Sequence, residues 1–315
     1  MARVLAIGSS NTDMTIRLPR LPRPGQTVLG GSLLNGPGGK GANQAVAAAR
    51  AGGKVVFVTA VGDDAFGRDA LDVYRREGVD VSHARTLPGV ASGVALIFVD
   101  DGGENMIGVT SGANARLGVE DVDRLPAGLF VRDQLLLVAG LEVPLEPIGR
   151  AMRRASEAGM RVVLNPAPFH EGLADSGILD GVDVLTPNRV ELGQLTGIET
   201  ETTDGVLRAC RAVQERSPRL NVVVTLGGEG CLVRSADGQT VNVPAHPVRA
   251  VDAVGAGDAF NGSLAVALAE GRPLVEAAAW ANAAAALAVT APGAQSALPT
   301  RAQIDRFVDT TGRLV

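Results

Sequence analysis

The segment 251–262, with the sequence VDAVGAGDAFNG, places an acidic residue directly after a glycine-rich turn. The turn is Gly-Ala-Gly at 255–257, Asp258 follows it, and an apolar, alanine-rich run to Ala269 then begins. A turn that starts a helix leaves backbone N–H groups unpaired, and such groups bind anions such as phosphate. A carboxylate at this point suits a hydroxyl that loses its proton to Asp258 while it attacks a phosphorus. Alternatively, Asp258 is only a helix N-cap, and this motif alone does not decide.

Four further polar residues stand where they could bind a polyol. Asn11 and Asp13 follow the first apolar run of the chain, Glu142 follows a later one, and Asn43 follows a second glycine-rich turn. Amide and carboxylate groups of this kind suit bidentate hydrogen bonds to neighbouring hydroxyls. Taken singly, each is better explained by turn formation or capping. Their expected placement at one sheet edge is what favours a binding site.

The segment 186–191, Thr-Pro-Asn-Arg-Val-Glu, places Asn188 and Glu191 three residues apart at a predicted strand-to-helix junction. This spacing puts both side chains on one helix face, where their oxygens could hold Mg²⁺ through water. The pair is also a helix-capping arrangement, and both interpretations stay open. In the same way, the glycine-rich segment 225–230 after an apolar strand is either a nucleotide cradle or a hairpin turn.

Two glycine-rich segments come close to common nucleotide-binding motifs but differ in detail. The segment 38–44, Gly-Gly-Lys-Gly-Ala-Asn-Gln, has Leu34 and Gly41 where a P-loop needs a glycine and a Ser or Thr. In the turn before Asp258, Phe260 stands where a dinucleotide-binding fingerprint has its third glycine or alanine. We therefore reject a P-loop and do not expect a redox enzyme.

Short apolar runs alternate with helical patterns through much of the chain. Strands are expected at Val4–Ile7, Val55–Thr59, Leu135–Val138, Arg161–Leu164, Val184–Thr186 and Val222–Thr225. Helices are expected at Gly41–Arg50, Ala65–Glu77, Leu145–Ala158, Arg189–Leu195, Asp204–Arg216, Ala256–Glu270, Leu274–Thr290 and Thr300–Asp309. This alternation predicts an α/β fold with a mainly parallel central sheet and helices on both faces, a Rossmann-like three-layer arrangement. Ligands of such sheets bind at the carboxyl ends of the strands.

Two stretches, at about residues 12–36 and 90–112, break this alternation with strand-like pieces. The second contains a predicted hairpin of Val94–Val99 and Asn105–Thr110. We expect them to form a small sheet that projects from a single α/β domain spanning residues 1–315. Because Val94–Val99 is apolar on both faces of a strand, this sheet would expose an apolar surface. We therefore expect it to be both a lid over the substrate and a homodimer interface.

The composition narrows the class of protein. The chain of 315 residues is 46% hydrophobic, which allows a large core, and its net charge of −5 without a long basic run argues against nucleic-acid binding. The N-terminal residues show no signal-peptide pattern, and no apolar run reaches the ~18 residues of a membrane span. Cys210 and Cys231 have no metal or redox spacing. We expect a cytoplasmic protein that acts on small molecules.

Several motifs occur together in a fixed order along the chain. They are GSSNTD at 8–13, GGKGANQA at 38–45, NPAP at 165–168, Asn188-x-x-Glu191, and DAVGAGD at 252–258. This set resembles the ribokinase-like carbohydrate kinase family, from about residue 3 to residue 308, and its two glycine motifs are specific for that family. The resemblance implies ATP-dependent phosphorylation of D-ribose at the 5-hydroxyl, with Mg²⁺ and K⁺ as cofactors.

The resemblance also implies a role for each matching residue. Asp258 would be the general base, and the N–H groups of Gly255, Ala256 and Gly257 would form the anion hole. The implied sugar ligands are Asn11, Asp13, Gly39, Lys40, Asn43, Glu142 and Asp258. The implied ATP contacts are Asn188, Thr225, Gly227, Gly230, Gly257 and Asn282. Asn188 and Glu191 would organise Mg²⁺ through water, and K⁺ would be held by Asp252 and by the carbonyls of Val254, Ala288, Ala291 and Gly293.

The chain departs from the family pattern at two positions. Ala297 stands where a serine hydroxyl usually completes the potassium shell, which leaves the strength of potassium activation open. Asn282 stands where a histidine often flanks the adenine, which leaves the packing around the base open.

Other functions remain as alternatives. They are a kinase for deoxyribose, fructose, a sugar phosphate or a nucleoside, and a non-catalytic sugar-binding regulator. A sugar-phosphate kinase should place more basic residues near the sugar than Lys40, and a nucleoside kinase needs stacking surface, whereas aromatic residues are only 3% of the chain. The intact acid beside the glycine turn argues against a protein that only binds.

Overall fold

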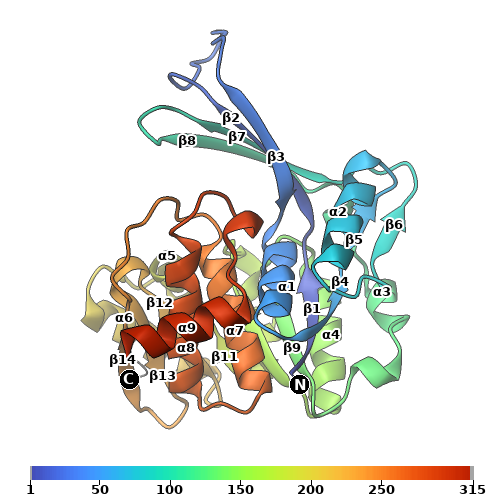
Figure 1. Ribbon diagram of the computed structural model, residues 1–315. Helices are drawn as coiled ribbons and strands as arrows, with labels where there is room; N and C mark the ends of the chain where they lie inside the picture. Colours follow the sequence, from blue (N-terminus) through green and yellow to red (C-terminus); the bar gives the residue numbers. More distant parts are fainter. Residues whose placement is uncertain (1, 313–315) are drawn as a thin grey trace.

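The computed structural model describes residues 2–312 and contains a central sheet of eight strands, in the order β14-β13-β12-β11-β10-β9-β1-β4 (Figure 1). The strands are β1 (Arg3–Gly8), β4 (Lys54–Val58), β9 (Leu135–Ala139), β10 (Arg161–Asn165), β11 (Val184–Leu185), β12 (Asn221–Thr225), β13 (Gly230–Arg234) and β14 (Thr240–Pro244). Six neighbouring strands pair in parallel, in the order β12, β11, β10, β9, β1 and β4. The last two strands, β13 and β14, pair antiparallel to their neighbours. The six predicted strands are the parallel ones, so the mainly parallel sheet is confirmed.

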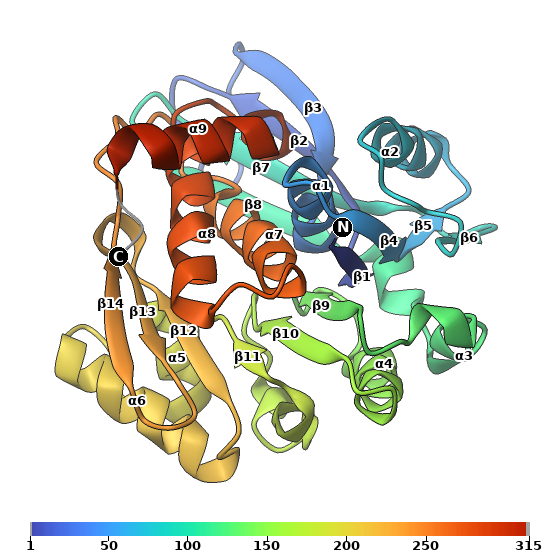
Figure 2. The same ribbon diagram turned by 60° about the horizontal axis from the view of Figure 1, so that its bottom comes forward.

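Both faces of the parallel part of the sheet are buried, and successive residues of its strands pack in opposite halves of the core. Leu135 and Leu137 of β9 pack in one cluster, and Leu136 and Val138 pack in the other. The first cluster includes residues of α1 (Lys40–Arg50), α2 (Ala65–Arg76), α7 (Ala256–Ala269), α8 (Leu274–Ala288) and α9 (Arg301–Thr311). The second includes residues of α3 (Val119–Asp123), α4 (Leu145–Glu157), α5 (Arg189–Thr196) and α6 (Thr203–Arg216). Figure 2 shows the resulting three layers.

The predicted helices are present, with ends that differ by no more than two residues. The two cysteines are buried, as small packing residues would be. Within residues 2–312, no helix combines the length and the apolar character that crossing a membrane requires.

A separate four-stranded sheet projects from the α/β body (Figure 1). Its order is β3-β2-β7-β8, formed by β2 (Asn11–Arg17), β3 (Ser32–Gly38), β7 (Gly93–Val99) and β8 (Asn105–Thr110). Several of its apolar side chains are exposed: Leu33, Leu34, Leu96, Met106, Ile107 and Val109. We call this sheet the lid. A two-stranded sheet of β5 (Ala60–Gly62) and β6 (Arg85–Leu87) was not expected, because neither strand is longer than three residues.

Helices α1 and α7 pack with their backbones in close contact. A Cβ atom at Gly262 would lie 2.5 Å from the carbonyl oxygen of Gln44 and 2.6 Å from the Cβ of Ala47. At the start of α1, a Cβ at Gly41 would lie 2.3 Å from the backbone nitrogen of Ser9. Glycine at both positions therefore lets α1 lie against the end of β1 and lets α7 lie against α1.

We predict that Gly262→Ala lowers the free energy of unfolding by about 1–3 kcal/mol, because the added methyl group overpacks the contact between α1 and α7. Gly149→Ala is the matched control, since a Cβ there meets its nearest atom, Nη1 of Arg153, at 3.5 Å. In that helix, alanine should stabilise by up to about 1 kcal/mol. Equilibrium urea unfolding followed by circular dichroism measures both. Equal midpoints for the two variants would contradict the close packing at Gly262.

Candidate active site

The turn before Asp258 opens helix α7. Gly255 is the N-cap residue and has a left-handed φ of 78°, and a Cβ there would lie 3.0 Å from the Cα of Ala294. A Cβ at Gly257, by contrast, would meet no atom within 4 Å. The first N–H groups of a helix have no partners within it. The backbone nitrogen of Ala256 donates to the carbonyl of Ala253 at 3.3 Å, whereas the space beside Gly257 is open, so an anion could approach the turn on that side.

Asp258 is the third residue of α7, and the alternative that it caps the helix is wrong because Gly255 occupies the N-cap position. Its carboxylate points instead toward α1. The oxygen Oδ2 accepts a hydrogen bond from Nδ2 of Asn43 at 2.9 Å, and Oδ1 accepts one from Nε2 of Gln44 at 3.0 Å. The side chain is buried. Its geometry is therefore set by helix packing rather than by local turn structure.

Burial raises the pKa of Asp258, and the nearby Glu142 carboxylate raises it further. The charge of Lys40 and the hydrogen bonds from Asn43 and Gln44 act in the opposite direction. A carboxylate with a raised pKa is a better proton acceptor near neutral pH, provided that enough of it remains ionised. Burial and Glu142 raise the pKa of Asp258, whereas Lys40, Asn43 and Gln44 favour its ionised form.

The predicted sugar residues come together around this carboxylate. Glu142 accepts hydrogen bonds from the hydroxyl of Ser9 and, at 3.0 Å, from the backbone nitrogen of Lys40. Burial, with the Glu142 and Asp258 charges, raises the pKa of Asp13 to about 6, while Lys40 lowers it. Four charged groups from four separate segments therefore lie within electrostatic range of one another.

Glycine residues make room for the polar groups at the start of the lid. A Cβ at Gly38 would lie 2.1 Å from the carboxyl carbon of Asp13, and one at Gly93 would lie 2.2 Å from Oδ1 of Asn11. Gly39 has a φ of 86° and faces the backbone of Asn11. Asn11 is also held by a 2.7 Å hydrogen bond to its Oδ1 from Asn114. The glycines of the second motif thus leave space for Asp13 and Asn11, because a side chain at Gly38 or Gly39 would clash with them.

Asn188 and Glu191 form a helix-capping box at the start of α5. Each side chain accepts a hydrogen bond from the other's backbone nitrogen, at 2.9 Å in both cases. Burial raises the pKa of Glu191, with a smaller effect from Asp258, and Lys40 lowers it. Asn188 and Glu191 therefore cap the helix, and Glu191 also lies within electrostatic range of Asp258.

The glycine-rich segment after β12 is a hairpin turn. β12 pairs antiparallel with β13, and Thr225 also bridges to Asn188. A Cβ at Gly227 or Gly228 would meet no atom within 4 Å, so the turn leaves room for a ligand. Gly230 faces the other way, toward the carbonyl of Val243 in β14. Asn282, which is buried in α8, donates to that same carbonyl at 3.2 Å. Gly230 and Asn282 therefore both help to hold β14.

The predicted cation ligands lie on two loops that Asp252 joins. Its carboxylate accepts hydrogen bonds from the backbone nitrogens of Val254 at 3.0 Å and Gly293 at 2.9 Å. Ala288 ends α8, and Ala291 lies in the same loop as Gly293. One carboxylate with neutral carbonyl oxygens is a donor set that suits a monovalent cation. Ala297, nearly buried in the same loop, offers no hydroxyl.

A Mg²⁺ ion would need ligands beyond the protein. In residues 2–312, no group of three or more His, Cys, Asp or Glu side chains could hold a metal ion. Asn188 and Glu191 provide only two side chains, so they fit Mg²⁺ that is completed by water and by nucleotide phosphates, the arrangement this ion favours.

Sequence reasoning assigned no role to several polar residues of the site. Gln44 contacts Asp258 directly, Gln295 donates to Oδ1 of Asn43 at 3.0 Å, and Ser9 and Asn114 hold Glu142 and Asn11. Gln44 belongs to the GGKGANQA motif, and its position next to Asn43 could have indicated that it also lies at the site. Gln295 and Asn114 stand in no such motif, and only the tertiary structure brings them to the site.

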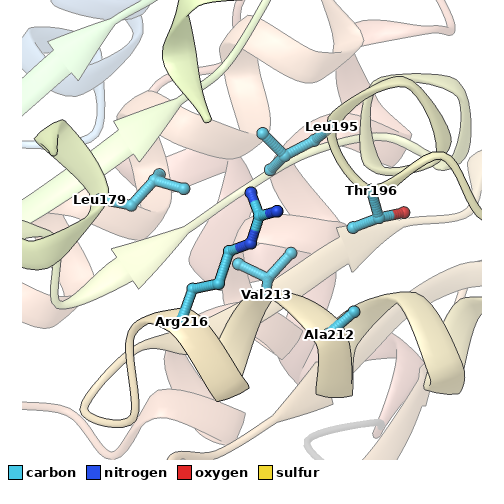
Figure 3. A pocket seen from close by; sticks show the side chains of 6 residues that line it. All are labelled: Leu179, Leu195, Thr196, Ala212, Val213 and Arg216. Carbon is cyan, nitrogen blue, oxygen red and sulfur yellow. The ribbon is translucent and has the colours of Figure 1, made fainter. Parts of the chain in front are cut away.

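The structure also has a pocket lined by Leu179, Leu195, Thr196, Ala212, Val213 and Arg216 (Figure 3). Leu179, Leu195 and Val213 belong to the half of the core that includes α4, α5 and α6. Asp258 lies on α7, across the central sheet. This pocket is therefore separate from the candidate active site.

Comparison with known proteins agrees with this geometry. Residues 1–301 match the model of the pfkB family carbohydrate kinases. A ribokinase of Haemophilus influenzae is 37% identical over 303 residues, which are 96% of this chain and 97% of the relative. A deoxyribokinase of Salmonella typhi is also 37% identical, over 305 residues, 97% of this chain and 98% of the relative.

A solved structure shows the same fold with ligands bound. The ribokinase of Arabidopsis thaliana, complexed with ribose and ATP, superposes with a TM-score of 0.88 at 28% identity, over 98% of this chain and 99% of that chain. Together with the lid, the buried acid and the glycine turn, these matches place the chain among the sugar kinases. The chain belongs to the pfkB family of carbohydrate kinases.

Proposed function

We propose that this enzyme transfers the γ-phosphoryl group of ATP to the 5-hydroxyl of D-ribose. The observation that supports this most directly is the position of the buried Asp258 carboxylate. It lies next to an open glycine turn and near a group of amide and carboxylate side chains. The turn suits the phosphoryl group, and the acids and amides suit an uncharged polyol. The comparisons support ribose through the ribokinases, and deoxyribose through the equally similar deoxyribokinase.

In the proposed mechanism, hydroxyls of the sugar bind to Asp13 on β2, to Asn43 in the first turn of α1 and to Glu142, which follows β9. The reacting hydroxyl then lies against Asp258 and loses its proton to the carboxylate as it attacks phosphorus. General base catalysis of this kind contributes about 10²–10⁴-fold to the rate. The new bond between the sugar oxygen and the γ-phosphorus forms as the bond from that phosphorus to the ADP oxygen breaks, so ADP leaves and the proton stays on Asp258.

The backbone N–H groups of residues 255–257 would stabilise charge on the transferring phosphoryl group, which is the larger task in such reactions. Glu191 and Asn188 would position Mg²⁺ through water, and Mg²⁺ would neutralise phosphate charge. Asp252 and the carbonyls of its two loops would hold K⁺ behind the turn. Positive charge at that point would strengthen the anion site from its protein side.

We predict that wild-type enzyme shows ribose-dependent ATP turnover, and that Asp258→Asn lowers kcat by at least about 10²-fold because it removes the base. A coupled assay with ribose, deoxyribose, fructose, a sugar phosphate and nucleosides, with and without K⁺, measures both the substrate and the cation dependence. Calorimetric titration of the variant with ribose checks that the site still forms. A variant that keeps more than about a tenth of the wild-type rate would contradict the base assignment.

We also predict that ribose affinity falls in acid because Asp13, with a pKa of about 6, must be ionised to accept two hydroxyl hydrogen bonds. At pH 5 the dissociation constant should be about tenfold larger than at pH 7.5, since only the ionised fraction binds. Titration calorimetry across this range measures it. Asp13→Asn should bind weakly at every pH, and a variant with the wild-type pH dependence would assign the effect to another group.

The lid has two apolar faces, and strand register assigns them different roles. Asp13 pairs with Ala95, and Thr15 with Ile97, so these residues share the face that covers the sugar site. Leu33, Leu96 and Met106 lie on the opposite face, and all three are exposed. We propose that this second face pairs with the same face of another copy, which would bury it.

We predict that wild-type protein sediments as a dimer at micromolar concentration, and that Leu96→Glu weakens the dimer at least tenfold by placing a charge in the apolar interface. Thr240→Glu is the control, because Thr240 is an exposed residue of β14, at the far edge of the central sheet. Sedimentation velocity measures both. A wild-type monomer at this concentration would contradict the interface.

A further inference from the structure

Two neighbouring residues of one helix hold the two oxygens of Asp258. Asn43 donates to Oδ2 and Gln44 donates to Oδ1. Asn43 also belongs to the proposed sugar site, and it keeps some exposure. Gln44 has 0% of its surface exposed, so it cannot contact a sugar. The only part of the proposed reaction that Gln44 touches is the carboxylate of Asp258.

A second hydrogen bond, to Asn165, fixes the orientation of the Gln44 amide. Its Nε2 also donates to Oδ1 of Asn165 at 2.9 Å, and Nδ2 of Asn165 donates to the carbonyl of Thr186 at 2.9 Å. A rotated amide would place Oε1 of Gln44 against the acceptor oxygens of Asn165 and Asp258. The Asn165 side chain therefore fixes which end of the Gln44 amide faces the acid.

This series of hydrogen bonds leads back to the glycine turn at residues 255–257. The hydroxyl of Thr186 donates to Oδ1 of Asn261, and Nδ2 of Asn261 donates to the carbonyl of Gly257 at 2.8 Å. Asn261 and Gly257 both belong to α7, the helix of Asp258. The base and the phosphate-binding turn are thus connected through side chains from α1 and from the ends of β10 and β11.

The arrangement leaves one polar atom without a partner. Among the described residues, Oε1 of Gln44 is buried and accepts no hydrogen bond. An unsatisfied buried acceptor is unfavourable, and an apolar side chain of similar size would avoid it. The Gln44 side chain keeps this unfavourable state while its N–H groups serve Asp258 and Asn165.

We propose that Gln44 is the positioning residue that orients the Asp258 carboxylate for proton abstraction, by holding one oxygen while Asn43 holds the other. This rests on the proposed role of Asp258 as the base. With both oxygens held from the α1 side, the carboxylate cannot rotate, and its remaining lone pairs face the sugar. The same hydrogen bond stabilises the ionised form, which burial and Glu142 disfavour.

Gln44→Met tests this proposal, since methionine keeps the length of the side chain and removes both N–H donors. We expect kcat to fall about 10- to 100-fold, the effect of one hydrogen bond to a charged group. KM for the sugar and for ATP should stay close to wild type, because Gln44 is fully buried. The acid limb of the pH–rate profile should move to higher pH, because loss of the donor raises the pKa of Asp258.

The other charged groups around Asp258 are unchanged in this variant. They are Asp13 on β2, Lys40 on α1, Glu142 after β9 and Glu191 on α5. A shift in the acid limb therefore reports on the lost hydrogen bond. Gln44→Asn is a second variant that keeps a polar amide but is one methylene too short to reach Asp258. It should move the acid limb in the same direction, and it covers the case in which Gln44→Met does not fold.

Gln134→Met is the matched control, because Gln134 is also a buried glutamine whose Oε1 has no partner in the described part of the chain. It precedes β9, at the end of the sheet opposite the site, and its substitution should leave kcat and the pH profile unchanged. If Gln44→Met and Gln44→Asn lose only stability and keep the wild-type acid limb and kcat, Gln44 is structural and the proposal is wrong. A wild-type protein without sugar-dependent turnover would instead remove the proposed function, and with it the base.

Discussion

Helices α1 and α7 approach so closely that Gly262 has no room for a side chain, and the active site depends on this contact. Asn43 and Gln44 come from α1, and Asp258 comes from α7, more than 200 residues later in the chain. Their hydrogen bonds form only if the two helices start at the same edge of the sheet and at backbone contact distance. A methyl group between them would separate the amides from the acid they hold.

The second consequence of this packing is electrostatic. Asp13, Glu142 and Asp258 lie within range of one another, with Lys40 as the nearest positive charge. Burial and the neighbouring carboxylates raise the pKa values of Asp13 and Asp258. Hydrogen bonds from Asn43 and Gln44 lower the pKa of Asp258, and the hydroxyl of Ser9 and the backbone nitrogen of Lys40 hold the Glu142 carboxylate in place. Sugar hydroxyls would add donors to Asp13 and Asp258, which links substrate binding to the ionisation of these two acids.

The loop that contains Gln295 connects the site to the proposed cation position. Gln295 donates to Asn43, and its own carbonyl accepts a 2.9 Å hydrogen bond from Arg50, which is paired with Glu77. Two residues earlier, Gly293 donates to Asp252. The base, the sugar ligands and the cation loops therefore form one continuous hydrogen-bonded region rather than separate motifs.

The sequence by itself determined the order of the elements and the residues that could do chemistry. Apolar runs of three to five residues predict buried strands because both faces of a parallel sheet are covered, and the six parallel strands were found this way. The short antiparallel strands β13 and β14 were missed, because the segment after residue 225 was interpreted only as a cradle or a turn. A glycine turn followed by an acid likewise identified Asp258, but could not separate a base from a helix cap.

Only the tertiary structure excluded the helix cap and showed the surroundings of Asp258, because its partners lie far away in the sequence. It showed that Gly255 caps the helix, that Asp258 faces two amides, and that Asn188 and Glu191 do form a capping box. Gln295 and Asn114 had no local signal at all, since a side chain with one distant contact leaves no pattern in its neighbours. Sequence spacing reports on residues that share one element, whereas a site built from several elements is defined by how those elements pack.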